Sequence, residues 1–297
     1  MMRNIALTAI LLALATLPLA YGQSNTLLHA YGAVYRLGSE GGNVTALVDE
    51  LNYAINLTRM GMVKNATEVA YNVLGQVPAL ERSLFISKVI SITVDLASAS
   101  AIIALATLAY VKRKAIIGYL LLKLRGGAFV KAGPGKPRTL LFNEEALAVI
   151  AAIALVVAIF ITAQGIVAEE AVRFSAIALL GPSGKLGGYP SSVPLGSQVN
   201  LYVYVYNDMG GPIWYVVRVY LVNSSYIAQP PLNLTPLLTF ERILPNNQSW
   251  IFPLGFVVNK TGSYRLVAEL WMYSPINYTL MYTGRFVQLY FNVTKVG

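Results

Sequence analysis

The stretch LYVYVYNDMGGPIWYVVRVYLV, residues 201–222, decides the fold of this chain. Its apolar, β-branched and aromatic residues alternate with polar ones at period two, a pattern typical of β-strands. The Gly-Gly-Pro sequence at 210–212 interrupts the pattern and marks a turn. We therefore predict a β-hairpin with strands at 201–206 and 213–222.

The same alternating pattern recurs through the rest of residues 168–297. Further strands are predicted at the ranges 172–180, 250–258, 263–273 and 284–294. About seven short strands in this length predict an antiparallel β-sandwich of immunoglobulin-like type. The chain has no cysteine, so such a domain is held by packing without a disulfide.

Composition predicts a membrane protein. The 297 residues are 56% hydrophobic and only 12% charged. Two apolar runs, 89–111 and 146–167, are each long enough to cross a hydrocarbon core of about 30 Å. The loop 112–143 between them carries eight basic residues and no acidic one, which predicts that it lies in the cytoplasm. We expect an α+β protein of the plasma membrane, with a two-transmembrane-helix hairpin.

The N-terminal part is predicted to be exported. Residues 1–22 have the basic start, apolar run and small-residue end of a signal peptide, although an uncleaved anchor would also fit. Residues 23–87 read as an extracytoplasmic helical domain with two short helices, ending near Gly61 and Gly75. Because two short helices bury little apolar area, we expect this unit to pack on another surface. Docking on the β-sandwich is one candidate, since both domains are predicted to leave the membrane on the same side.

Nine of the seventeen asparagines lie in Asn-x-Ser/Thr sequons, where chance would give roughly two. None lies between residues 66 and 222. We predict glycosylation of these asparagines and place both flanking domains outside the membrane. The nine are Asn43, Asn56, Asn65, Asn223, Asn233, Asn247, Asn259, Asn277 and Asn292.

A resemblance supports the same topology. The run ALLGPSGKLGGYP at 178–190, then Gly196, then a strand ending at Asn207, resembles an archaeal membrane-protein family catalogued as domain of unknown function 1616. The likeness covers about residues 146–297. It implies a β-rich outer domain after transmembrane helices in an archaeal surface protein, and it implies no catalytic residues.

Polar residues in the spans suggest how the hairpin is held. Asp95 is the only acid well inside an apolar run, and Thr162 and Gln164 lie at matching depth in the second run. We predict a polar contact that locks the two helices, while an ion or proton role for Asp95 remains open. Basic residues near the inner leaflet are predicted to contact anionic lipid. They are Lys112, Arg113, Lys114, Lys123 and Arg125.

Chemistry-bearing residues are sparse. With one histidine, no cysteine and widely separated outer acids, we expect no catalytic, cofactor-binding or metal site. The aromatic residues of the β domain have two interpretations, core packing or a binding surface. They are Tyr202, Tyr204, Tyr206, Trp214, Tyr215, Tyr220, Trp271 and Tyr273.

These observations favour a non-enzymatic, membrane-anchored cell-envelope protein that presents a glycosylated β-sandwich for protein or glycan contact. An accessory subunit of a membrane transport or secretion complex is the alternative, and an envelope enzyme is a second one. The expected partners are a bilayer with an anionic inner leaflet and an envelope protein or glycan. Homo-oligomerisation stays open, and a nucleic-acid partner is not expected.

Overall fold

The computed structural model describes residues 25–112 and 173–295, with single positions at 116, 118, 119, 123, 148, 152, 155, 156 and 159. The predicted signal peptide, most of the basic loop and most of the second span, including Thr162 and Gln164, lie outside the described residues. The chain divides into two compact units, Met1–Leu84 with Val172–Gly297, and Phe85–Ala171. Each is described separately below.

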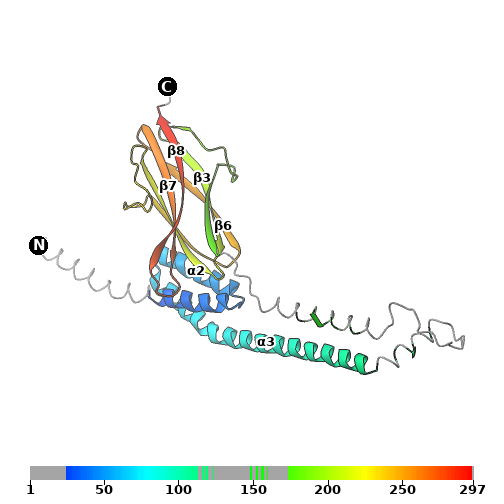
Figure 1. Ribbon diagram of the computed structural model, residues 1–297. Coiled ribbons are helices and arrows are strands. Elements are labelled where there is room, and N and C mark those ends of the chain that lie inside the picture. Colours follow the sequence, from blue (N-terminus) through cyan, green and yellow to red (C-terminus); the bar gives the residue numbers. More distant parts are fainter. Residues whose placement is uncertain are drawn as a thin grey trace, which may run out of the picture. The chain divides into compact units, whose positions relative to one another are not determined.

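The C-terminal region is a β domain of two sheets (Figure 1). A small sheet has the order β1-β3-β6, and a large sheet has the order β2-β8-β7-β4-β5. All pairings are antiparallel except β2 with β8. The strands are β1 Phe174–Leu180, β2 Ser192–Pro194, β3 Gln198–Asp208, β4 Ile213–Asn223, β5 Leu238–Leu244, β6 Gln248–Val257, β7 Gly262–Tyr273 and β8 Leu280–Thr294.

One hydrophobic core lies between the two sheets. It contains the inward residues of β3, among them Val203 and Val205, and those of β4, among them Val217 and Val219, all fully buried. Alternate positions of each strand point into this core, as the period-two pattern requires. The chain is therefore α+β with a C-terminal two-sheet domain, and the six strands predicted from the sequence are confirmed.

The predicted hairpin between 201–206 and 213–222 is wrong. β3 pairs with β1 and β6, whereas β4 pairs with β5 and β7. The connection at 209–212 thus crosses from one sheet to the other, and the two strands face each other across the core. Buried Asn207 holds this crossover, because its side-chain amide nitrogen donates to Gly211 O at 2.9 Å and Leu244 O at 2.8 Å. An alternating pattern does not distinguish a strand's neighbour in its sheet from the strand facing it.

The N-terminal part contains three helical segments, where two were predicted. Residues 25–39 are helical, followed by α2 (Thr45–Arg59) and α3 (Val63–Val111). α2 ends as predicted at Gly61, whose φ of 77° lets Gly61 N reach Thr58 O at 3.0 Å and Met62 N reach Leu57 O at 2.9 Å. This pair of bonds is a Schellman motif.

The predicted helix end at Gly75 is wrong. α3 continues through Gly75 and Pro78 to Val111 as one helix of 49 residues. A glycine inside a helix costs only about 1 kcal/mol, too little to end a helix whose flanking residues favour it. The segment predicted as the first span, 89–111, is therefore the last part of a longer helix.

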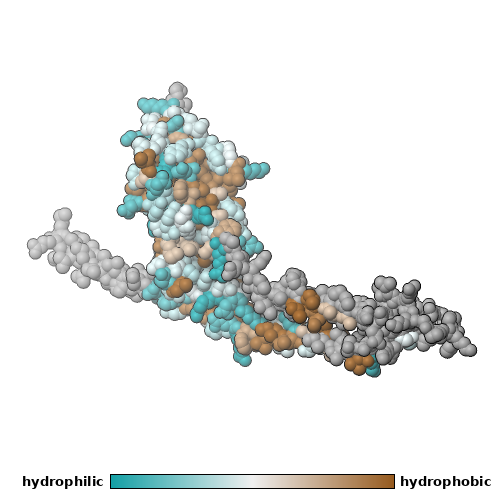
Figure 2. Space-filling model, viewed as in Figure 1, coloured by the Kyte–Doolittle hydropathy of each residue, from teal (hydrophilic) through white to brown (hydrophobic). Residues whose placement is uncertain are grey.

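From Phe85 onward, α3 is largely apolar, and nearly all of its described side chains are exposed. Phe85, Ile90 and Leu96 are 68%, 57% and 63% exposed, and Figure 2 shows hydrophobic side chains gathered along the helix. The part of α3 from Val63 to Ile102 is long and apolar enough to cross a membrane, judged by length and composition alone. The second span falls mostly outside the described residues, so the two-helix hairpin stays a prediction.

The helical segments of the first unit pack on one end of the β domain (Figure 1). A single buried cluster joins Leu47, Leu51 and Ala70 of the helices to Trp214 and Ile243 of the large sheet. The expectation that the short helices need another surface to bury their apolar side is confirmed.

Candidate functional site

The junction between helices and sheet is built around Tyr31. Its hydroxyl accepts from the backbone N–H of Trp214 at 3.3 Å and donates to the backbone carbonyl of Tyr273 at 3.2 Å. The hydroxyl therefore links the helix 25–39 to β4 and β7 at once. Burial raises the pKa of Tyr31, so the group stays neutral and can keep both bonds.

Asn52 of α2 covers an exposed sheet edge. Its amide nitrogen donates to Ile243 O at 2.9 Å, and its amide oxygen accepts from Ile243 N at 2.8 Å. β5 is the last strand of the large sheet, so these backbone groups have no neighbouring strand. The side chain pairs with the strand as another strand would, which protects the edge from pairing with a second chain.

Beyond the helices, the outward face of the large sheet carries a buried acid. Glu269 is 0% exposed, and its two oxygens accept from Leu232 N at 2.6 Å and from Trp271 Nε1 at 2.9 Å. Arg218 is the cross-strand neighbour of Glu269 and stacks on the Trp271 ring, 4.4 Å from its centroid. Glu269 thus fastens the 224–237 segment onto the sheet, which is a structural use of a carboxylate.

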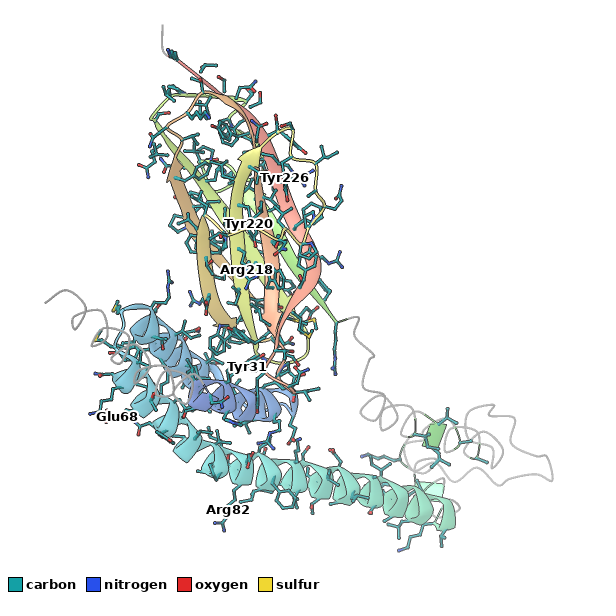
Figure 3. The ribbon with its side chains drawn as sticks, turned by 90° about the vertical axis from the view of Figure 1, so that its left-hand side faces the viewer. Tyr31, Glu68, Arg82, Arg218, Tyr220 and Tyr226 are labelled. Atoms are coloured by element: carbon teal, nitrogen blue, oxygen red, sulfur yellow. The ribbon has the colours of Figure 1, made fainter. Side chains whose placement is uncertain are left out.

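Glu241 lies on the same face, nearer the helices. Burial raises the pKa of the Glu241 carboxyl. The Trp214 indole and the guanidinium groups of Arg59 and Arg218 lower the pKa, but by less than burial raises it. The Trp214 indole N–H favours the charged carboxylate but does not reach hydrogen-bond geometry, and it has no other partner among the described residues. The face therefore combines charge and aromatic rings between Tyr31 and Tyr226 (Figure 3).

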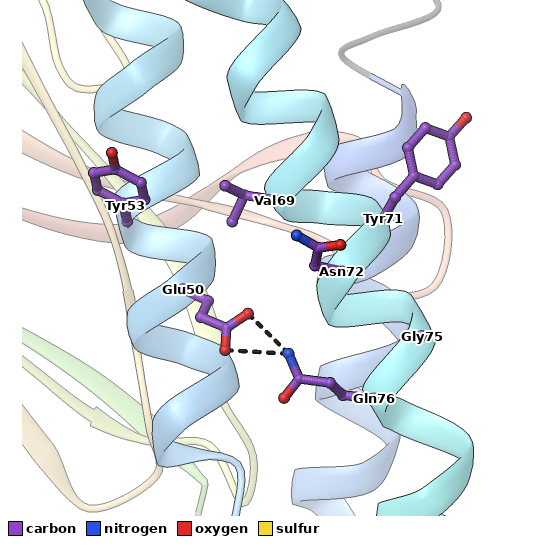
Figure 4. A pocket seen from close by; sticks show the side chains of 7 residues that line it. All are labelled: Glu50, Tyr53, Val69, Tyr71, Asn72, Gly75 and Gln76. Atoms are coloured by element: carbon purple, nitrogen blue, oxygen red, sulfur yellow. Dashed lines mark hydrogen bonds between the residues drawn. The ribbon is translucent and has the colours of Figure 1, made fainter.

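A shallow groove lies between α2 and α3 (Figure 4). Gln76 closes one side by donating to both oxygens of Glu50, at 3.0 and 3.2 Å. Tyr53 and Tyr71 stand at the groove, 58% and 62% exposed. Its volume is about 610 Å³, and it offers contact surface without an enclosed cavity.

The structure divides the predicted aromatic residues between the two interpretations. Trp214, Tyr215 and Tyr220 are buried, as the packing interpretation predicts. Trp271 and Tyr273 are partly exposed but still pack against the buried cluster that joins the helices to the large sheet. Tyr202, Tyr204 and Tyr206 are partly exposed and belong to no core cluster of the described residues. Sequence reasoning missed Arg218, Glu241 and Asn52, although a lone arginine inside an apolar strand was a usable signal for the first.

All nine sequon asparagines are exposed. Two of them sit in turns closed by their own sequon: Ser225 Oγ donates to Asn223 Oδ1 at 2.7 Å, and Thr279 Oγ1 to Asn277 Oδ1 at 2.8 Å. By contrast, Asn52 and Asn207, which lie outside sequons, use their amides inside the fold. The predicted acceptors are therefore accessible on the unit that contains the β domain.

The remaining predicted site residues are described only in part. Asp95 is an exposed residue of α3, and its predicted partners lie outside the described residues. Lys112 and Lys123 are exposed, whereas Arg113, Lys114 and Arg125 also lie outside. Within the ranges that the structure describes, no cluster of three or more His, Cys, Asp or Glu side chains is arranged to hold a metal ion.

No protein-family model and no curated protein matches this chain. Among solved structures, it is similar to the CARDB domain of the PF1109 protein from Pyrococcus furiosus in complex with di-metal ions, with 16% identity and a TM-score of 0.30 over 41% of this chain and 89% of that one. A solution structure of the same domain gives 16% and 0.29 over 41% and 94%. A β-glucosidase from Listeria innocua in complex with glucose gives 10% and 0.28 over 41% of this chain and only 16% of its own length.

Proposed function

We propose that the chain is a non-enzymatic, membrane-anchored protein of the cell envelope, which presents a glycosylated β-sandwich of immunoglobulin-like type for protein or glycan contact. The anchor would be the two-helix hairpin formed by 89–111 and 146–167. The observation that carries the proposal is the exposure of all nine sequon asparagines on one compact unit. Glycan can be added there without disturbing the core, and only on chain that leaves the cytoplasm.

The second unit supports the membrane anchor. From Phe85 to Val111 the helix exposes apolar side chains, which water would disfavour and lipid accepts. The first unit supports a contact role through its exposed surface, where Tyr53 and Tyr71 stand at the open groove between α2 and α3.

The absence of cysteine makes topology directly testable. Single cysteines introduced by Val257→Cys in β6, Asn72→Cys in α3 and Pro134→Cys in the basic loop can be labelled on intact cells with a membrane-impermeant maleimide. We expect the first two to react and the third to react only after permeabilisation. The parent chain is the control and should not be labelled. Labelling of Pro134→Cys alone on intact cells would overturn the proposal.

An accessory subunit of a membrane transport or secretion complex is the second candidate. The exposed apolar length of α3 favours it, because helices of a polytopic partner could cover the same side chains. Extraction of the tagged full chain in mild detergent tests this. Stoichiometric co-purification of a polytopic protein supports the subunit role, and recovery of the chain without a partner argues against it.

A further inference from the structure

The outward face of the small sheet differs from an ordinary solvent-facing sheet. Its central strand β3 presents Tyr202, Tyr204 and Tyr206 on alternate positions, about 7 Å apart. None of these belongs to a core cluster of the described residues. We call this surface the tyrosine face. Its cross-strand neighbours are Leu180 and Pro253 beside Tyr202, Ala178 and Ile251 beside Tyr204, and Ala176 and Ser249 beside Tyr206.

The tyrosine face carries no charged residue along the three tyrosines, and Asp208, the last residue of β3 on the same side, is the acid that bounds it. No Asp, Glu, Lys or Arg occupies β3 from Gln198 to Tyr206, the β1 residues from 174 to 180, or any position of β6. Antiparallel sheets normally expose polar or charged residues to water. Several neighbours of the tyrosines are small, so the rings are left partly open. An uncharged ring surface of this kind suits a neutral ligand with C–H faces.

Carboxamides stand at both ends of the tyrosine row. At one end, the amides of Gln198 and Asn200 fill the space above Gly255, where they would lie 3.0 and 3.4 Å from a Cβ at that position. At the other end, the hydroxyl of Tyr206 donates to Asn247 Oδ1 at 2.6 Å. Carboxamides offer neutral donors and acceptors, which match hydroxyl groups.

Asn247 is the sequon asparagine on this surface. It is exposed, and its φ of 59° places it in a tight turn before β6. Tyr206 holds its amide oxygen, while its amide nitrogen, the atom that takes an N-linked glycan, has no hydrogen bond among the described residues. A sugar attached there begins beside Tyr206, at the end of the row.

We propose that the neutral glycan carried by Asn247 lies along the tyrosine face and covers Tyr206, Tyr204 and Tyr202. This inference rests on the proposed function, because it requires that the β domain be exported and glycosylated. The sugar rings stack on the tyrosine rings, and their hydroxyl groups bond the amides of Asn200 and Gln198. The glycan then covers the outward face of the small sheet, as the helices and the 224–237 segment cover the outward face of the large sheet.

The test compares tyrosine reactivity in the full chain, purified in detergent from a glycosylating host. Glycopeptide mass spectrometry first determines which sequons are occupied. Nitration by tetranitromethane is then followed at each tyrosine in the parent, Asn247→Gln and Ser249→Ala. Both substitutions remove the sequon, but Ser249→Ala keeps Asn247 and its bond from Tyr206. We expect nitration of Tyr202, Tyr204 and Tyr206 to rise several-fold in both variants.

Two internal controls accompany the test. Tyr290 on β8 is 53% exposed and should react equally in all chains. Asn223→Gln removes a sequon at the end of β4 and should leave the tyrosine face protected. If Asn247 carries glycan in the parent and nitration of the three tyrosines is unchanged in both variants, the inference is overturned. Protection that depends on protein concentration also overturns it, because a second copy would then be the cover.

Occupancy separates the two proposals. If other sequons carry glycan and Asn247 does not, the inference fails and the proposed function stands. If no sequon is occupied in the native host, both fail.

Discussion

The outward faces of the two sheets have the same alternating sequence pattern but differ in how deeply their side chains are buried. β3 places Tyr202, Tyr204 and Tyr206 outward, and these stay partly exposed. β4 places Trp214, Val216, Arg218 and Tyr220 outward, and all but Arg218 are buried, under the helices or the 224–237 segment. The difference teaches that alternation assigns a residue to a face, while the elements packed on that face decide its burial.

The largest test of this comparison uses two tyrosines in equivalent outward positions. Tyr220→Ala should lower the free energy of unfolding by about 3–5 kcal/mol, because the ring is 2% exposed and packs on Leu232 and Val267. Tyr204→Ala should cost less than about 1 kcal/mol, as for a cross-strand pair on an open face. Urea unfolding of each full chain, followed by tryptophan fluorescence, measures both values. Equal costs would refute the comparison.

A smaller effect is expected where the cover is fastened. Glu269→Ala leaves Leu232 N and Trp271 Nε1 without their acceptor and should cost about 3 kcal/mol. Glu269→Gln keeps one acceptor oxygen and should cost less. Limited proteolysis should then cut the 224–237 segment first in the alanine variant. Resistance equal to that of the parent would show that this carboxylate does not hold the segment.

The Asn52 side chain, which covers the sheet edge from α2, should contribute less to the free energy of unfolding than Glu269 does. Asn52→Ala uncovers the N–H and carbonyl of Ile243 and should cost about 1–3 kcal/mol. Asn72→Ala on α3 is the matched control, since Asn72 is exposed at the groove, and should change stability by less than about 0.5 kcal/mol. Thermal unfolding compares the two. A control that melts as low as Asn52→Ala would contradict the edge-covering role.

The smallest effect is a pH dependence at Glu241. Because burial raises its pKa, the folded state keeps a proton that the unfolded chain has already released as pH rises past the ordinary glutamate range. Folded-state stability therefore falls with rising pH until the folded carboxyl also ionises. Glu241→Gln should remove this slope and be the more stable chain at neutral pH. An unchanged slope in a series of unfolding curves would rule out Glu241 as its source.

Much of the local structure was readable from the sequence. The period-two stretches marked six strands, and Gly61 marked the end of α2. β5 was missed because Glu241 and Arg242 break its apolar pattern, although both lie in the strand. The long-range contacts of Tyr31 and Asn52 were out of reach, since their partners lie about two hundred residues away.

The helix at 25–39 was missed for an instructive reason. Gly32 and Gly38 lower the helix propensity of this stretch, and no helix was predicted there. In the structure, Tyr278 lies against Gly32, and a Cβ at Gly38 would come within 2.6 Å of Pro212. The residues that weakened the local helix signal are those that let the helix approach the β domain.

The sequence by itself determined the alternation of the strands, the end of α2 and the apolar character of 89–111, because these depend on residues within a few positions of one another. Only the tertiary structure decided that β3 and β4 belong to different sheets, that other segments cover the outward face of β4 and that the outward tyrosines of β3 stay partly exposed among the described residues. Those outcomes depend on contacts between distant segments, and a period of two is the same whichever element packs on the face.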